Sequence, residues 1–176
     1  MSKLTHEEIV ARQKEQLKQN RLPFHVILND IRSLYNVGSI FRTADAAGVE
    51  KIWICGITGH PPSTMISKTA LGAETQVVWE YRVDIEELLA ELKARGYQLA
   101  MLEQTKQSVS HDEFVVTPPV CLIVGNEIEG ISDHLINRCD VSVEIEMAGL
   151  KNSLNVSVAF GVMAYHIRRQ LKQKVK

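Results

Sequence analysis

The chain has 176 residues, of which 45% are hydrophobic and 23% charged, and its formal net charge at pH 7 is −1. This length suits one domain with a core of its own, and no apolar run approaches the roughly 20 residues that a membrane span requires. The N-terminus lacks the apolar stretch of a signal peptide. Cys55, Cys121 and Cys139 form no CxxC pair, so a disulfide framework and a zinc site are not indicated, and we expect a protein of the reducing cytoplasm.

The first 22 residues predict a helical extension. Thr5 and Glu8 have the spacing of a capping box, which predicts a helix that begins there and runs to about Asn20. Apolar positions are sparse along this stretch, so we expect a surface helix or an appendage. The core domain is expected to begin at Pro23 and to span residues 23–176.

Within the core domain, short apolar β-branched runs alternate with helical stretches. Strands are predicted at residues 25–28, 51–55, 76–79, 98–102, 121–124 and 141–145. Helices are predicted near residues 38–47, 63–70, 85–95 and 132–137, and from about residue 153 to beyond residue 169. The alternation predicts an α/β fold with a mostly parallel six-stranded sheet and helices on both faces.

Basic residues are concentrated at the two ends of the chain. Residues 1–22 carry a net charge of +2 and residues 166–176 carry +5, so the remainder must carry −8 to give the total of −1. The ends are either solvated helix termini or arms that face phosphate groups.

In parallel sheets, ligands usually bind beyond the carboxyl ends of the strands. Residues 125–132 follow a predicted strand and have the glycine spacing of a P-loop, but Ile131 occupies the lysine position and Glu127 and Glu129 lie inside the loop. A phosphate cradle needs a cation and amide donors, so this segment is not the P-loop of a nucleoside triphosphatase. The structural interpretation is that residues 125–132 form an ordinary strand–turn–helix loop. The sequence also lacks GxGxxG after the first strand, GxSxG, HxxxH and HExxH, so a standard dinucleotide site, a serine hydrolase and a metal site are not expected.

Three further polar residues allow both a structural and a functional interpretation. Arg42, in a predicted helix, is either a surface ion-pair residue or a cation within reach of Asn36. Ser153 is either a helix N-cap or a site residue, and Asn155 is either a first-turn residue or a site residue.

Taken together and in order, these segments resemble the three motifs of the SpoU family of knotted RNA methyltransferases. The matching segments are residues 36–48 (NVGSIFRTADAAG), 122–132 (LIVGNEIEGIS), and 145–149 (IEMAG) continuing to 153–159 (SLNVSVA). Residues 102–105 (LEQT) also resemble the family's loop after the fourth strand, and the resemblance extends over about residues 23–170.

The resemblance implies a C-terminal deep trefoil knot, S-adenosylmethionine as methyl donor, and a homodimer with the active site completed near the dimer interface. It implies that the donor is held by loops around residues 102–105, 125–130 and 145–154. The donor-binding candidates are Leu102, Glu103, Gly125, Asn126, Gly130, Ile145, Met147 and Leu154.

The resemblance also implies an active-site set and a reaction, the methylation of a ribose 2′-hydroxyl in RNA, preferably tRNA. The set consists of Asn36, Arg42, Glu127, Ser153 and Asn155. Because arginine stays protonated, Arg42 is expected to grip a phosphate and stabilise the developing alkoxide, with Asn36 and Glu127 orienting it. The RNA contacts expected from the basic ends are Arg12, Lys14, Lys18, Arg21, Arg168, Arg169 and Lys172.

Three alternatives stay open at this point. The substrate could be rRNA, the protein could be a knotted RNA-binding protein without catalysis, or it could be a related knotted enzyme that methylates a base nitrogen. The base identity and position of the target nucleotide are not determined by the sequence.

Overall fold

The protein is seen here in a computed structural model that describes residues 3–17 and 21–174. Its core is a seven-stranded sheet in the order β3-β2-β1-β6-β4-β7-β5, in which every neighbouring pair runs parallel. The strands are β1 (Leu22–Asn29), β2 (Val49–Cys55), β3 (Val78–Arg82), β4 (Gln98–Leu102), β5 (Val109–Ser110), β6 (Val120–Val124) and β7 (Val141–Glu144).

The α/β class is confirmed, but the predicted number of six strands is wrong. The seventh strand, β5, has only two residues and pairs with β7 at the sheet edge, so it has no apolar run that could reveal it. Strand β3 begins two residues later than predicted. The preceding residues form the turn η1 (Ala73–Thr75), and the Gln76 and Val77 amides donate hydrogen bonds back to the Ala73 carbonyl.

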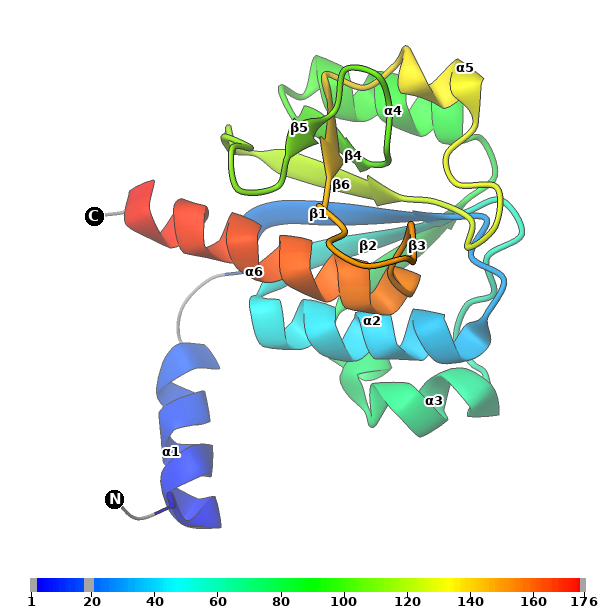
Figure 1. Cartoon of the computed structure of the whole chain (residues 1–176). Helices are drawn as coiled ribbons and strands as arrows, with labels where there is room; N and C mark the ends of the chain where they lie inside the picture. The colour runs from blue at the N-terminus through cyan, green and yellow to red at the C-terminus, as the bar shows by residue number, and fades with distance from the viewer. Residues whose placement is uncertain (1–2, 18–20, 175–176) are drawn as a thin grey trace.

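Helices cover both faces of the sheet, as predicted. They are α2 (Leu34–Ala47), α3 (Thr64–Ala70), α4 (Ile85–Ala94), α5 (Asp133–Ile136) and α6 (Val156–Lys174). A further helix, α1 (His6–Leu17), comes before the first strand and does not cover the sheet. Figure 1 shows α2 and α6 side by side against one face, with α3 packed on α2, and α4 with α5 on the other face. Two separate apolar clusters result, one on each side of the sheet.

The central strands are buried on both faces. All five residues of β6 and the last six of β1 are buried, which is why these segments read as continuous apolar runs rather than as an alternating pattern. Burial of such runs on both sides is the main favourable contribution to folding. It fixes β1 and β6 next to each other, although about 100 residues separate them in the chain.

Helix α2 is longer than predicted because it has an N-cap that precedes the apolar pattern. Ser33 accepts a hydrogen bond from the Asn36 amide, so the helix begins at Leu34 instead of Gly38, and it ends at Gly48 in a left-handed conformation with φ 78°. Gly38 allows close packing on α3, since a Cβ there would lie 2.1 Å from Oγ1 of Thr69.

Helix α1 precedes the sheet domain, and its predicted capping box is present. The Thr5 amide donates to the Glu8 carboxylate at 2.7 Å, and the Glu8 amide donates to the Thr5 hydroxyl at 3.3 Å. Within residues 3–17 and 21–174, no helix combines the length and hydropathy needed to cross a membrane.

Because all strands are parallel, their carboxyl ends lie along one edge of the sheet. The loops after β1, β6, β4 and β7 therefore follow one another along this edge. Three of these are the loops of the sequence motifs, and the fourth follows β4, so the fold places all four segments together.

Candidate active site

The loops at the carboxyl edge of the sheet enclose a cavity of about 630 Å³. Its walls come from the ends of β4, β6 and β7, from the loops that follow them and from the first turn of α6. The lining residues are Leu102, Glu103, Gln104, Val124, Gly125, Asn126, Glu127, Ile128, Glu129, Gly130, Val143, Glu144, Ile145, Met147, Asn152, Ser153, Leu154, Asn155, Val156 and Ala159.

The structure brings together all the residues that were predicted to hold a methyl donor. Each of the eight lines this one cavity: Leu102, Glu103, Gly125, Asn126, Gly130, Ile145, Met147 and Leu154. Glu127, Ser153 and Asn155 of the predicted active-site set line it as well. Three segments that are distant in the sequence therefore form one site.

Glu103 ties two of the cavity loops to each other. One of its carboxylate oxygens accepts a hydrogen bond from the Ile131 amide at 2.9 Å, and the other accepts from the Gln104 amide at 2.9 Å. Gly130 makes this contact possible, because its φ is +68° and a Cβ at this position would lie 2.2 Å from the Glu103 carboxylate. Glycine is required here both for its conformation and for the close approach.

Asn126 shapes the loop after β6 from within. Its side-chain oxygen accepts hydrogen bonds from the Ile128 and Glu129 amides at 2.9 and 3.1 Å, and its amide group donates to the Asp30 carbonyl at 2.9 Å. The side chain thus folds the loop into an Asx turn and attaches it to the loop after β1.

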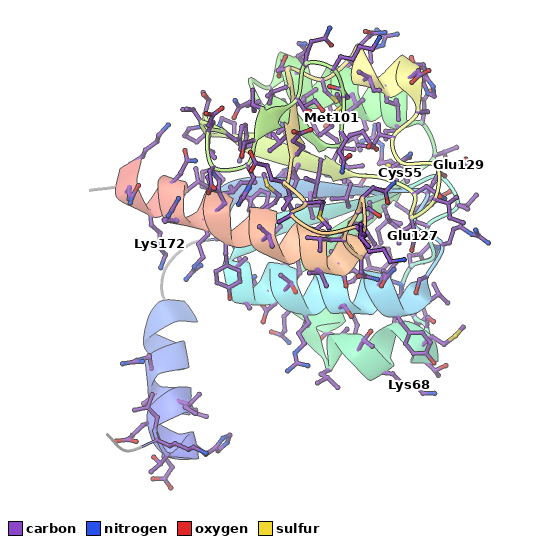
Figure 2. All side chains as sticks on the ribbon, viewed as in Figure 1. Cys55, Lys68, Met101, Glu127, Glu129 and Lys172 are labelled. Atoms are coloured by element: carbon purple, nitrogen blue, oxygen red, sulfur yellow. The ribbon has the colours of Figure 1, made fainter. Side chains whose placement is uncertain are left out.

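Glu127 connects the same two loops at the cavity rim. Its carboxylate accepts hydrogen bonds from the Arg32 amide at 2.9 Å, the Ser33 amide at 3.1 Å and the Asn36 side chain at 3.0 Å. Figure 2 shows Glu127 at the end of the molecule where α2 and α6 both begin.

These three hydrogen bonds set the charge of Glu127. Partial burial alone would raise the pKa of the carboxyl group, but the hydrogen bonds from Arg32, Asn36 and Ser33 outweigh burial, and the pKa of Glu127 lies below its usual value. The side chain is therefore an anion at neutral pH, beside the positive end of the α2 dipole.

Asn36 extends the network to α6. Its side-chain oxygen accepts a hydrogen bond from the Asn155 amide group at 3.1 Å, while the Asn155 oxygen accepts from the Ser157 amide at 2.9 Å and from the Ser157 hydroxyl at 2.7 Å. Asn155 is thus the N-cap of α6, and Ser153 is not. Ser153 lies exposed in the preceding loop, where it lines the cavity.

Arg42 lies apart from this network. It is exposed on α2, six residues after Asn36, and it is not among the residues that line the cavity of its own chain. Six residues correspond to a rotation of about 240° around a helix, so Arg42 and Asn36 leave α2 in different directions. The expectation that Asn36 and Glu127 orient Arg42 finds no support, because both side chains bond elsewhere and no hydrogen bond or ion pair of Arg42 occurs among the described residues.

The predicted RNA contacts fall into three groups. Arg21 is paired with Asp45 at 2.8 Å and Arg168 donates to the Ala47 carbonyl at 2.8 Å, so both hold the end of α2. Arg12, Arg169 and Lys172 are exposed, and Figure 2 shows Lys172 at the opposite end of α6 from Glu127. The other two predictions, the Lys14 side chain and Lys18, lie outside the described residues.

Several cavity residues were missed by sequence reasoning. Gln104 donates a hydrogen bond to the Asn152 carbonyl at 2.6 Å, across the cavity from one loop to another. Glu144 accepts a hydrogen bond from the Ser108 hydroxyl at 2.6 Å. Gln104 and Glu144 are each next to a residue that was predicted, so their places at strand ends were the available signal.

The cavity is acidic. Glu103, Glu127, Glu129 and Glu144 line it, and none of the lining residues is Lys, Arg or His. Such walls favour a cationic ligand over a polyphosphate. In the part of the chain that the structure describes, no group of three or more His, Cys, Asp or Glu side chains is placed to hold a metal ion.

The fold and this site define a class of protein that comparisons with known proteins identify. The model of the SpoU rRNA Methylase family matches residues 23–165. The chain is 32% identical to the tRNA (guanosine(18)-2'-O)-methyltransferase of Aquifex aeolicus over 99% of its own length and 82% of that protein.

Solved structures give the same result. A crystal structure of the A. aeolicus TrmH/SpoU tRNA modifying enzyme matches with a TM-score of 0.83 and 31% identity, over 96% of this chain and 85% of that one. An AdoMet-bound rRNA methyltransferase from Sinorhizobium meliloti matches with a TM-score of 0.79 and 30% identity, over 84% of this chain and 56% of that longer one. The chain therefore belongs to the SpoU methylase family, whose members have the knotted SPOUT fold.

Proposed function

We propose that this protein uses S-adenosylmethionine to methylate a ribose 2′-hydroxyl in tRNA, with a guanosine as the first candidate. The observation that carries the proposal is the hydrogen-bonded set Glu127–Asn36–Asn155 at the rim of an acidic cavity. The set joins the three family motifs at the point where a donor and an RNA must meet. The relatives named above supply the reaction type and the tRNA preference.

The chemistry of the cavity fits the methyl donor. S-adenosylmethionine carries a sulfonium and an ammonium group against one carboxylate, and the four glutamates of the wall offer complementary charge. The loops around Gly125 and Met147 would place main-chain amides and carbonyls around the adenine ring. Leu102, Ile145 and Leu154 would supply apolar contacts, an arrangement typical of small-molecule sites.

The reaction then needs alignment more than activation. When bound, the donor supplies a methyl group on positively charged sulfur, which is already reactive. The ribose 2′-oxygen bonds to the methyl carbon as the carbon–sulfur bond breaks, and the hydroxyl proton passes to a neighbouring phosphate or to water. Arg42 stays protonated, so it stabilises the developing negative charge and grips the adjacent phosphate.

A homodimer supplies Arg42 to the site. The sequence of the last helix places apolar residues on more than one of its faces, namely Val156, Phe160, Val162, Met163 and Ile167, a width that favours association. Phe160, Met163 and Ile167 are buried in their own chain, and the face of α6 that remains exposed has Val158, Val162 and Tyr165, which are 52, 37 and 52% exposed. These three follow helical spacing and form an apolar stripe on α6, the helix that packs against α2, on which Arg42 is exposed. A second copy packed on this stripe brings its own Arg42 close to the cavity that Arg42 does not reach within one chain.

The exposed basic side chains at the chain ends extend the RNA-binding surface, and α1 acts as a helical arm on the methyltransferase domain of residues 23–176. Arg169 and Lys172 lie about 21 to 26 Å along α6 from Asn155, from the helix rise of 1.5 Å per residue, a distance that suits a folded tRNA rather than one nucleotide. A cytoplasmic location agrees with tRNA as substrate and with three cysteines that are all unpaired.

The test is nucleoside-resolved mapping of 2′-O-methylation in total RNA from cells with and without the protein, repeated in vitro with tRNA, rRNA and labelled donor. We expect one ribose methylation in tRNA to depend on the protein. A dependent site in rRNA would redirect the substrate, and a methylated base nitrogen would overturn the reaction. Donor binding by calorimetry without any RNA methylation would instead favour an RNA-binding protein that has lost catalysis.

A further inference from the structure

Arg32 stands out among the exposed cations because its main chain is built into the active-site network. It lies in the loop between β1 and α2, and its amide donates a hydrogen bond to the Glu127 carboxylate at 2.9 Å. The same carboxylate holds Ser33 and Asn36. The Cα of Arg32 is therefore fixed within a few ångströms of a residue that lines the cavity.

The residues on both sides of Arg32 are held in place by burial and hydrogen bonds. Ile31 is completely buried, and its amide donates to the Thr58 hydroxyl at 2.9 Å. Ser33 is the N-cap of α2. The backbone that carries the Arg32 guanidinium is thus ordered before any ligand binds, which lowers the entropic cost of a contact.

The guanidinium itself has no partner within residues 3–17 and 21–174, although it is exposed beside an acidic cavity. Glu127 does not pair with it, and its carboxylate instead accepts hydrogen bonds from three other N–H groups. By contrast, Arg21, Arg82 and Arg138 all form ion pairs within the chain. An arginine that is held in place yet unpaired at the rim of an active site is suited to an anion from outside the protein.

We propose that Arg32 binds a backbone phosphate of the substrate RNA next to the target nucleotide and so fixes the position of the target ribose over the donor cavity. This inference rests on the proposed function and adds a substrate-positioning residue outside the three family motifs. In this arrangement Arg42 stabilises the charge on the reacting ribose. Arg32 binds a neighbouring phosphate and so sets which nucleotide of the strand lies over the cavity.

The experiment compares Arg32→Ala, Arg32→Lys and a matched control, Arg138→Ala. Arg138 is also exposed, but it lies before β7 at the opposite edge of the sheet and pairs with Glu86. Each alanine variant removes one positive charge, so the comparison separates a local contact from a general electrostatic effect. Thermal unfolding checks the fold, and both side chains are exposed.

The Arg32→Ala variant loses one charge-assisted contact, so its affinity for RNA should fall about tenfold or more. The magnitude of its slope of log K against log salt should fall by about 0.7. KM for RNA should rise while kcat at saturating RNA stays close to that of the unchanged protein. Arg32→Lys should keep the salt slope and recover only part of the affinity. Arg138→Ala should match the unchanged protein.

Three results would overturn the inference. The first is an equal RNA affinity of Arg32→Ala and Arg138→Ala. The second is a loss of kcat at saturating RNA for Arg32→Ala without a change in KM. The third is weaker donor binding by Arg32→Ala with unchanged RNA binding. The last would mean that Arg32 contacts the donor carboxylate. Failure of the unchanged protein to methylate RNA would instead count against the proposed function, and direct RNA binding of the three variants would still test Arg32.

Discussion

At the scale of single residues, the site is built on hydrogen bonds between side chains that come from different motifs. Glu127 receives three N–H donors from the segment that leads into α2, and Asn36 passes the connection on to Asn155 at the start of α6. The sequence placed these residues at strand ends and helix starts. It did not show which of these side chains are in contact, because a sequence motif gives residue types but not the directions in which the side chains point. It therefore could not show that Asn36 bonds Glu127 and Asn155 instead of Arg42, or that Asn155 and not Ser153 caps α6.

Arg42 is expected to act on the reaction and not on the fold. Arg42→Ala should slow single-turnover methyl transfer by roughly 10²- to 10³-fold, the usual cost of one electrostatic donor to a developing charge. Donor affinity should stay unchanged, because the residues expected to hold the donor are the loop residues that line the cavity within one chain. Arg42→Lys should recover little, since an ammonium cannot reproduce the two-point grip on phosphate. Circular dichroism controls for folding. A folded Arg42→Ala protein with a normal single-turnover rate would remove Arg42 from the mechanism.

Glu127 should give the protein a measurable pH dependence of stability. Its pKa is lower in the folded protein than the value of about 4.3 in an unfolded chain, so it stabilises the fold above that pH, and the contribution is lost as the pH falls through the folded pKa. Glu127→Gln should lower the free energy of unfolding at pH 7 by about 1 kcal/mol, the net value of one hydrogen bond. The difference from the unchanged protein should shrink below about pH 4.

Urea unfolding at pH 7 and near pH 3.5 measures this difference. Glu129→Gln is the matched control, since Glu129 lies two residues away on the same loop and its carboxylate forms no hydrogen bond with any described residue. Equal stability of the two variants at pH 7 would show that the three donors do not depend on the Glu127 charge.

At the scale of elements, the sequence predicted the central strands well and the edges less well. Strands β1, β2, β4 and β6 are buried apolar runs, and burial on both faces leaves a clear pattern. The short edge strand β5 and the start of β3 have no such pattern, because an edge strand is set by its neighbours and by the preceding turn. The sequence showed that α6 has a wide apolar face, but periodicity could not show which of its positions face the core and which stay exposed.

The loop after β6 depends on Gly130 for its shape. Gly130→Ala should lower stability by roughly 1–2 kcal/mol from the left-handed backbone alone, and it should also weaken donor binding, because the new Cβ would displace the Glu103 carboxylate from the Ile131 amide. Gly96→Ala is the control: its φ is +81°, but a Cβ there meets nothing within 4 Å. It should show the same loss of stability with normal donor affinity. Calorimetry with S-adenosylmethionine would contradict this account if both variants bound the donor equally well.

At the scale of the whole molecule, one chain holds the cavity proposed for the donor, but Arg42, the proposed catalytic residue, is not among the residues that line it. Arg42 is instead exposed on α2, the helix that packs against α6. The arrangement favours a dimer in which association and activity depend on the same surface. The sequence predicted a homodimer from the family resemblance and from the wide apolar face of the last helix, and the exposed fractions show which part of that helix its own chain leaves uncovered.

Val162→Glu places a charge in the centre of the stripe and should convert the dimer into a monomer, because a buried unpaired carboxylate is costly. Light scattering should then give about 19.8 kDa instead of twice that mass, and methyl transfer should be lost while donor binding remains. Ala90→Glu on α4 adds the same charge to the other side of the sheet and should leave the dimer intact. Full activity from a monomeric Val162→Glu protein would refute the need for a second copy.

The Glu127–Asn36–Asn155 network has a further consequence, which concerns the energetic coupling of two ligands. Glu127 and Asn155 line the cavity, and through Asn36, Arg32 and α2 the network reaches the surface where we propose that RNA lies. If filling the cavity orders this network, the product S-adenosylhomocysteine must tighten RNA binding, and RNA must tighten product binding by the same factor, since linkage between two sites is reciprocal. Titrations of each ligand with and without the other measure both factors. Asn36→Ala cuts the network between its two halves and should bring both factors to one, so that the two sites of a folded protein no longer respond to each other.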